Sequence, residues 1–204
     1  MCIRDRVEQK KGALEEAELL IVDLRGNEGG SSWVTRDLMP FIRSARQRPA
    51  IGASGAPAVL ASELLANYFE RMVEQDWVPD DLPDRMRRQL GQVIPFDSAA
   101  PDEHVESPAP TQLELPKHVA VLVDGSTISA GEAMVLAARR SEKTTVFGEP
   151  TAGAIDYQNV MLTRVSSRER GIHLGIPTIA ASSTLPVGSL NASGIPVDVA
   201  MPVQ

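Results

Sequence analysis

The segment 118–133, HVAVLVDGSTISAGEA, constrains the fold of this chain more than any other stretch. It holds an apolar run of strand length, Val119–Val123, then a cluster of small and hydroxyl residues, then helix-forming residues. A strand, a tight turn and a helix expose a hydroxyl at the turn, beside the free backbone N–H groups of the new helix. The pattern predicts a nucleophile at Ser126 or Ser129, although either serine can instead be a simple helix cap.

Two further apolar runs, residues 19–24 and 144–147, also end in turns that contain glycine. Continuous apolar runs of this length are typical of strands buried on both faces of a parallel sheet. Helical patterns follow the first run over 33–46 and the central run over about 130–141. The order of strands and helices predicts an α/β fold with parallel strands and helical crossovers.

Residues from about 50 to 116 are interpreted as an insertion that caps this core. Residues 57–75 have the spacing of an amphipathic helix, with Pro57 in its first turn, and a second helix is expected near 83–92. Residues 97–116 are rich in Pro, Ala, Ser and acidic residues, which predicts a solvated loop. The insertion is therefore expected to be helical, with an acidic, proline-rich loop at its end.

The last third of the chain predicts a C-terminal β-hairpin over 159–165 and 172–179, and a final short strand within 190–199. We therefore expect one core domain over residues 1–204. The first six residues, MCIRDR, resemble translated adaptor sequence, and no apolar stretch of a signal peptide follows them. We expect the chain to be a fragment that lacks its natural N-terminus.

Composition excludes several classes of function. The net charge is −7 without a Lys/Arg cluster, so the basic footprint of a nucleic-acid-binding protein is absent from the sequence. No apolar run approaches the length of a membrane span. The one cysteine is Cys2, and the histidines are scattered at His104, His118 and His173. No metal site is therefore expected, and no disulfide within the chain.

The turns after the three apolar runs carry the candidate chemistry. They are Gly29-Gly30, the Ser129 turn and Thr151-Ala152-Gly153. In a parallel sheet such turns gather at one edge, where ligands bind. A serine hydroxyl there can attack a carbonyl while glycine N–H groups hold the oxygen that becomes negative, which is the arrangement that acyl transfer needs. A plain strand-to-helix turn remains the alternative for the glycine segment.

Four stretches in order, LIVDLRGNEGGSS, VAVLVDGSTISAGEA, VFGEPTAGA and NASGIPVDVAMP, resemble the motifs of the C-terminal-processing (tail-specific) serine peptidases, a family that includes the tricorn core protease. The resemblance runs from about residue 18 to the end. It implies the fold shared with Clp protease and crotonase, Ser129 as nucleophile, and no cofactor. It further implies oxyanion-binding N–H groups at Ala130 and at Gly29 or Gly30. Ser126 and Ser32 are then turn or capping residues.

The sequence departs from this family at the expected base. One branch of the family uses a Ser–Lys dyad with a glutamine four residues after the lysine, and these positions hold Ala154 and Gln158. Lys117 and Lys143 lie outside the matching motif. The tricorn-like branch instead uses a histidine from a preceding region and a glutamate, whose place Asn191 takes. Gln158 and Asn191 are therefore candidate supporting residues only.

The leading interpretation is a serine endopeptidase core of the tricorn-like branch, acting on peptide or protein substrates, with its base supplied from missing N-terminal sequence. The fragment alone is then expected to be inactive, unless His104 or His173 reaches the serine. The alternative is a catalytically inactive module of the same fold that binds a peptide or an apolar ligand. The resemblance favours a periplasmic or secreted location, and the sequence does not constrain the oligomeric state.

Overall fold

The computed structural model describes most of the 204 residues and divides them into two compact units. The described residues are 3–30, 37–73, 78–96, 115–165 and 171–202. Unit 1 comprises Met1–Gly52, Pro108–Ile155 and Leu190–Gln204, and unit 2 comprises Ala53–Ser107 and Asp156–Ser189. The single core domain over residues 1–204 stays a prediction. Ser32, His104 and the acidic loop over 97–114 lie outside the described residues.

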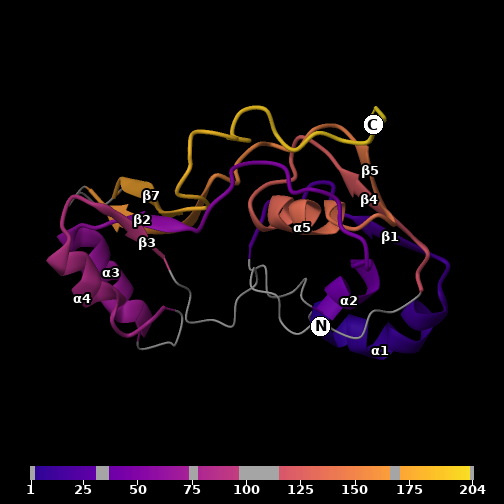
Figure 1. The fold of residues 1–204 in the computed structure, drawn as a ribbon, viewed down its shortest axis with the longest axis horizontal. Helices are drawn as coiled ribbons and strands as arrows, with labels where there is room; N and C mark the ends of the chain where they lie inside the picture. The colour runs from indigo at the N-terminus through magenta and orange to yellow at the C-terminus, as the bar shows by residue number, and fades with distance from the viewer. Residues whose placement is uncertain (1–2, 31–36, 74–77, 97–114, 166–170, 203–204) are drawn as a thin grey trace. The chain divides into compact units, whose positions relative to one another are not determined.

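Unit 1 contains a four-stranded parallel sheet in the order β1-β4-β5-β8 (Figure 1). The strands are β1 (Leu19–Asp23), β4 (His118–Val123), β5 (Thr144–Gly148) and β8 (Val199–Ala200). Helix α5 (Ala130–Arg139) connects β4 to β5, while α1 (Ile3–Glu16) precedes β1 and the short α2 (Met39–Ile42) follows it. The α/β class and the parallel strands are confirmed, whereas the detailed likeness to Clp protease and crotonase stays a prediction.

The core of unit 1 lies between the sheet and α5. Val22, Val121 and Val146 are in register across the three central positions of β1, β4 and β5, and all are buried. Side chains of α5 pack against this row, chiefly Met134, Val135 and Ala138. Alternate strand residues therefore face the helix, as the two-residue repeat of a strand requires.

The expectation that the run at 19–24 is buried on both faces is wrong for β1. Leu19 and Ile21 are 53% and 58% exposed, while Val22 on the opposite face is buried. The reason is position, since β1 is an edge strand of the sheet. A continuous apolar run predicts a strand but does not reveal whether one or both of its faces are covered.

The helix expected over 33–46 is also wrong in extent. Within the described residues only Met39–Ile42 are α-helical, after a short 3₁₀ turn at residues 37 and 38. Pro40 stands in the first turn of α2, where its missing N–H removes no intrahelical hydrogen bond. The proline therefore marks the beginning of this helix and not a bend within a longer one.

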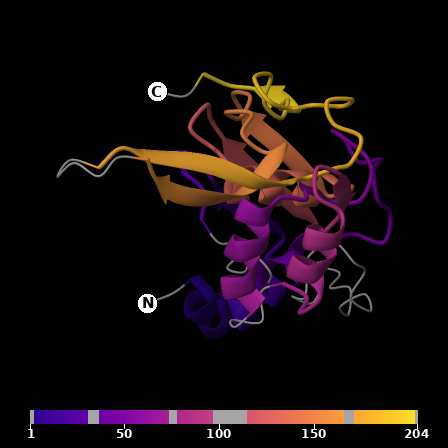
Figure 2. The ribbon, with the colours of Figure 1, turned by 90° about the vertical axis from the view of Figure 1, so that its left-hand side faces the viewer.

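Unit 2 is an antiparallel sheet that packs on two helices (Figure 1). Its strand order is β3-β2-β7-β6, with β3 (Val93–Pro95), β2 (Ala58–Leu60), β7 (His173–Ala180) and β6 (Tyr157–Arg164). Helices α3 (Glu63–Val73) and α4 (Leu82–Arg88) lie side by side against it, with Phe69, Leu82 and Met86 fully buried. The predicted hairpin is confirmed as β6 and β7, the long two-stranded ribbon of Figure 2.

The single helix expected over 57–75 is a strand followed by a helix. Ala58–Leu60 form β2, because Val59 pairs with Ile94 of β3, a strand that the sequence pattern did not reveal. Helix α3 begins at Glu63, and the Ser62 hydroxyl accepts a hydrogen bond from the Leu65 N–H at 3.3 Å. Long-range pairing thus overrides the local helical spacing of residues 57–60.

Candidate functional site

Ser129 occupies the turn between β4 and α5, and its side chain is exposed. Its backbone has φ 53° and ψ −115°, in the positive-φ region that residues with a side chain seldom adopt. Conformations of this kind cost about 1–3 kcal/mol and cluster at functional sites. The turn therefore holds the serine in a strained conformation at the amino end of a helix.

Gly29 brings the turn after β1 against Ser129. A Cβ built on Gly29 would lie 2.9 Å from the Ser129 Cβ and 3.4 Å from its Oγ, so any side chain at this position would collide with the serine. Its φ of +93° also favours glycine. The structure thus brings together two of the turns that the sequence placed at one edge of the sheet.

The candidate oxyanion donors differ in their availability. The Gly29 N–H is donated to Asn27 Oδ1 at 2.9 Å, whereas the Gly30 N–H has no acceptor among the described residues. Ala130 is the first residue of α5, where an N–H lacks an intrahelical acceptor. Gly30 and Ala130 therefore fit the donor role better than Gly29 does.

Asn27 is a residue of this site that the sequence analysis did not single out. Its carbonyl oxygen accepts the Ile128 N–H at 3.0 Å, and its side chain accepts the Gly29 N–H. A Cβ on Gly131 would lie 3.0 Å from Asn27 Oδ1. Asn27 thus fixes the first turn against the start of α5. It follows Gly26 and precedes Glu28, and nothing in the local pattern distinguishes it from an ordinary turn asparagine.

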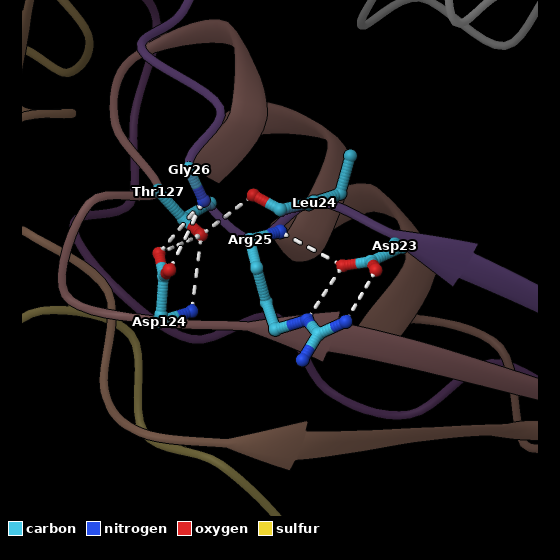
Figure 3. Close-up of polar contacts among 6 residues, drawn as sticks. All are labelled: Asp23, Leu24, Arg25, Gly26, Asp124 and Thr127. Carbon is cyan, nitrogen blue, oxygen red and sulfur yellow. Dashed lines mark hydrogen bonds and ion pairs between the residues drawn. The ribbon is translucent and has the colours of Figure 1, made fainter. Parts of the chain in front are cut away.

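A second polar contact joins the β1 and β4 turns through Asp124 and Thr127 (Figure 3). The Asp124 carboxylate accepts the Gly26 N–H at 3.0 and 3.1 Å and the Ser126 N–H at 2.9 Å. The Thr127 hydroxyl is fully buried and donates to the Leu24 carbonyl at 2.9 Å. Ser126 is therefore a turn residue, as the family resemblance implies.

Glu132 connects the serine turn to the loop that follows β5. It is fully buried, and its carboxylate accepts hydrogen bonds from four donors. These are the N–H groups of Ser129 at 3.0 Å, Gly153 at 2.8 Å and Ala154 at 2.8 Å, and the hydroxyl of Thr151 at 2.6 Å. Glu132 thereby connects the third turn expected at the site, Thr151-Ala152-Gly153, to the backbone of Ser129.

The loop over 151–155 is in turn packed against residues 190–195. The Ile195 N–H donates to Thr151 Oγ1 at 2.8 Å, and the Ile155 N–H donates to Asn191 Oδ1 at 3.3 Å. A Cβ on Gly194 would lie 2.0 Å from the Thr151 carbonyl oxygen. Asn191 therefore belongs to the same unit as Ser129, at the far side of the loop that Glu132 holds.

The remaining candidate residues are distributed over both units. Gln158 lies in unit 2, in β6. His118, with Lys117 just before it, begins β4, and Lys143 precedes β5, so all three lie at the amino ends of strands whose carboxyl ends carry the site. Partial burial lowers the pKa of Lys143. Within unit 1, the described residues thus offer no histidine or lysine at the carboxyl edge of the sheet.

One exposed ion pair lies at the end of β1. Arg25 donates from Nε to Asp23 Oδ1 at 2.9 Å and from its terminal nitrogen to Oδ2 at 2.7 Å (Figure 3). These side-chain hydrogen bonds from Arg25 lower the pKa of Asp23 below its ordinary value. Both residues are solvent-exposed, so the pair orders the end of β1 more than it stabilises the fold.

Two searches of the described residues bear on cofactors and membranes. No group of three or more His, Cys, Asp or Glu side chains that could hold a metal ion is found there. None of the described helices is long and apolar enough to cross a membrane.

The fold is similar to that of several solved structures. Mature CPAF aligns with a TM-score of 0.57 at 15% identity over 97% of this chain, and its complex with lactacystin with 0.54 at 16% over 97%. A protein from Parabacteroides merdae ATCC 43184 aligns with 0.51 at 14% over 98%. The chain spans 42% of each CPAF chain and 50% of the third. No curated protein sequence matches it.

A family model gives the more direct assignment. It matches residues 3–201, nearly the whole chain, and is described as peptidase family S41. The match includes the β1 turn, the Ser129 turn and the loop after β5, and it confirms the resemblance that the four motifs carry. On this evidence the chain belongs to peptidase family S41.

Proposed function

We propose that this chain is the nucleophile-bearing part of a serine endopeptidase, with Ser129 forming the acyl-enzyme. The observation that carries the proposal is the Ser129 turn, in which an exposed serine with φ 53° precedes a helix and lies so close to Gly29 that a Cβ there would collide with it. Such a turn leaves room for a substrate carbonyl beside the hydroxyl. It also directs the N–H groups of the helix start toward that carbonyl.

The reaction begins with attack of Ser129 Oγ on the carbonyl carbon of a peptide bond. The carbonyl oxygen becomes negative, and the N–H groups of Ala130 and Gly30 are the proposed donors that stabilise it. Collapse of this intermediate expels the amine of the leaving peptide and leaves an ester on Ser129. Water then hydrolyses the ester, and the serine is regenerated. Peptides or proteins are accordingly the proposed substrates.

The general base is the part of the mechanism for which unit 1 offers no described candidate. Ala154 stands where a Ser–Lys dyad would have its lysine, and its N–H is donated to Glu132. The proposal therefore takes the base from sequence that precedes this chain, as in the tricorn-like branch, with Asn191 in support. This chain spans less than half of the CPAF chains that it matches, which leaves room for such a segment.

The absence of a base from the described part of unit 1 also favours a second candidate, a catalytically inactive binding module. In that case Ser129 and the N–H groups would hold a peptide carbonyl without cleaving it. A histidine-bearing segment ahead of residue 1 would favour the peptidase. An extended sequence without histidine or lysine there would favour the binding module.

A fluorophosphonate probe tests the peptidase directly, because it labels only an activated serine. The full-length protein should be labelled, and Ser129→Ala should abolish the labelling. Ser126→Ala is the matched control, since Ser126 is exposed in the same turn and donates only its N–H to Asp124. Labelling that survives Ser129→Ala would disprove the assignment, and a wild-type protein that binds peptide without labelling would support the binding module.

A further inference from the structure

Glu132 is a buried anion without a cationic partner among the described residues. Its side chain is fully inaccessible to solvent, and no described Lys, Arg or His forms an ion pair with it. A buried carboxylate is costly unless hydrogen bonds compensate for the lost water. Glu132 lies in the first turn of α5, where the helix dipole favours negative charge. The compensation must come from this dipole and from the four donors around the carboxylate.

All four partners of Glu132 act as donors. Three are backbone N–H groups, which can only donate. The fourth is the Thr151 hydroxyl, which accepts the Ile195 N–H at 2.8 Å and so directs its own hydrogen to Glu132. A protonated acid would need an acceptor, and none of the four supplies one. The arrangement therefore fits a carboxylate and fits neither an acid nor an amide equally well.

Each oxygen of the Glu132 carboxylate accepts hydrogen bonds from two donors. Oε1 accepts from Thr151 and Gly153, and Oε2 accepts from Ser129 and Ala154. One rigid, planar group thus holds the backbone of the proposed nucleophile and the loop after β5 at the same time. Because the Ser129 backbone is strained, its N–H bond to Oε2 opposes relaxation of the turn.

We propose that Glu132 is a positioning residue, whose carboxylate fixes the strained Ser129 turn to the loop over 151–154 so that the hydroxyl and the neighbouring N–H groups keep a reactive geometry. The catalytic part of this inference rests on the proposed peptidase function. The coupling of the two segments does not, since it concerns only contacts within unit 1. Glu132 itself touches no substrate in this role.

Amide hydrogen exchange measured by NMR tests the coupling in this chain without any need for activity. The reporters are the N–H groups of Ser129, Gly153 and Ala154. The internal controls are the N–H groups of Ile128 and Ala152, which lie in the same segments but donate to the carbonyls of Asn27 and Thr127 at 3.0 Å. Glu132→Gln keeps the shape of the side chain but turns an NH₂ group toward one pair of donors. Glu142→Gln, at an exposed position after α5, is the matched control.

The expected result is selective. In Glu132→Gln, exchange should rise about tenfold or more either at Gly153 or at Ser129 and Ala154, depending on which side the NH₂ group faces. Exchange at Ile128 and Ala152 should change by less than about threefold. A uniform rise at all five amides would show general loosening and would overturn the proposal. Unchanged exchange at all three reporters would overturn it as well. Glu142→Gln should leave every one of these amides unaffected.

A second pair of variants covers the case in which Glu132→Gln does not fold. Thr151→Val removes the hydroxyl donor at nearly constant volume, and Thr151→Ser retains it. Thr151→Val should accelerate exchange at Gly153, which shares Oε1 with Thr151, and Thr151→Ser should restore protection. Equal exchange at Gly153 in the two variants would refute the role of the carboxylate.

Labelling kinetics in the full-length protein test the catalytic part. Glu132→Gln and Thr151→Val should lower the maximal rate of fluorophosphonate labelling about tenfold or more, with little change in the probe concentration at half-maximal rate, and Thr151→Ser should label normally. Normal labelling in a folded Glu132→Gln protein would overturn this part. If the wild-type protein does not label at all, the proposed function fails, and the exchange experiment alone decides whether Glu132 couples the two segments.

Discussion

Asp124 and Glu132 show how the same chemical group serves two neighbouring junctions at different depths. Asp124 is half-buried and joins the β1 turn to the β4 turn through N–H groups near the surface. Glu132 is fully buried and joins the start of α5 to the loop after β5. Water can replace the partners of Asp124, whereas it cannot reach the buried carboxylate of Glu132. We call the Asp124 contacts the outer junction and the Glu132 contacts the inner junction. Substitutions at the outer junction should therefore lower the free energy of unfolding less than substitutions at the inner junction.

The largest expected difference concerns two glycines, Gly194, which packs against the loop that Glu132 holds, and Gly26 at the Asp124 junction. Gly194→Ala would place a Cβ 2.0 Å from the Thr151 carbonyl, at a φ of +70°, and should lower the free energy of unfolding by about 4 kcal/mol. Gly26→Ala at the outer junction has a similar φ of +68° but no atom within 4 Å, so it should cost only about 1 kcal/mol. Urea denaturation measures both. Equal losses would remove the distinction between the junctions.

The second-largest difference is expected between the stability losses that follow removal of the Glu132 and Asp124 carboxylates. Glu132→Ala leaves four donors without an acceptor, among them the buried Thr151 hydroxyl and Gly153 N–H, and should lower the free energy of unfolding by about 3 kcal/mol. Asp124→Ala should lower it by about 1 kcal/mol, because solvent can satisfy the freed N–H groups. Thermal melts of the two variants, recorded by circular dichroism at one protein concentration, make the comparison. A larger loss for Asp124→Ala would contradict the ranking by burial.

A gain of serine reactivity in a variant at position 154 would show that the loop held by Glu132 lies near Ser129. Ala154 is exposed, and its N–H shares Glu132 Oε2 with the N–H of Ser129. Ala154→Lys should therefore place an amine near the serine and raise fluorophosphonate labelling of this chain about 10²-fold over its basal rate. Ala154→Met is the control for side-chain length without a base. Equal labelling of the two variants would mean that position 154 does not reach the hydroxyl.

The smallest effect is expected at the surface, at Asp23. Because the Arg25 hydrogen bonds lower its pKa in the folded state, ionised Asp23 favours folding above the unfolded-state pKa, and this contribution is lost as the pH falls through the folded-state pKa. In Arg25→Gln, the pKa of Asp23 should rise toward its ordinary value. An NMR titration of the Asp23 carboxyl carbon measures this change. An unaltered pKa would mean that the ion pair is not formed in solution.

Much of the candidate site could be predicted from the sequence, because its parts are local. The strand at 119–123, the turn at Ser129 and the helix from Ala130 are encoded within one short segment. Parallel strands then bring the β1 and β4 turns to one edge, so the approach of Gly29 to Ser129 follows from topology. The contribution of Glu132 was not foreseen, since three of its four donors come from a loop about twenty residues further along the chain.

In the fold as well, local features could be predicted from the sequence and features that depend on long-range contacts could not. The sequence by itself determined the parallel α/β core, the β6–β7 hairpin and the serine at the strand–helix junction, because hydrophobic periodicity and turn chemistry act over a few residues. Only the tertiary structure decided that Ala58–Leu60 form a strand, that β1 is exposed on one face, and that Glu132 ties Ser129 to Gly153 and Ala154. These outcomes depend on which distant segment supplies a pairing edge, a covering face or a hydrogen-bond donor, and local sequence patterns carry no record of that choice.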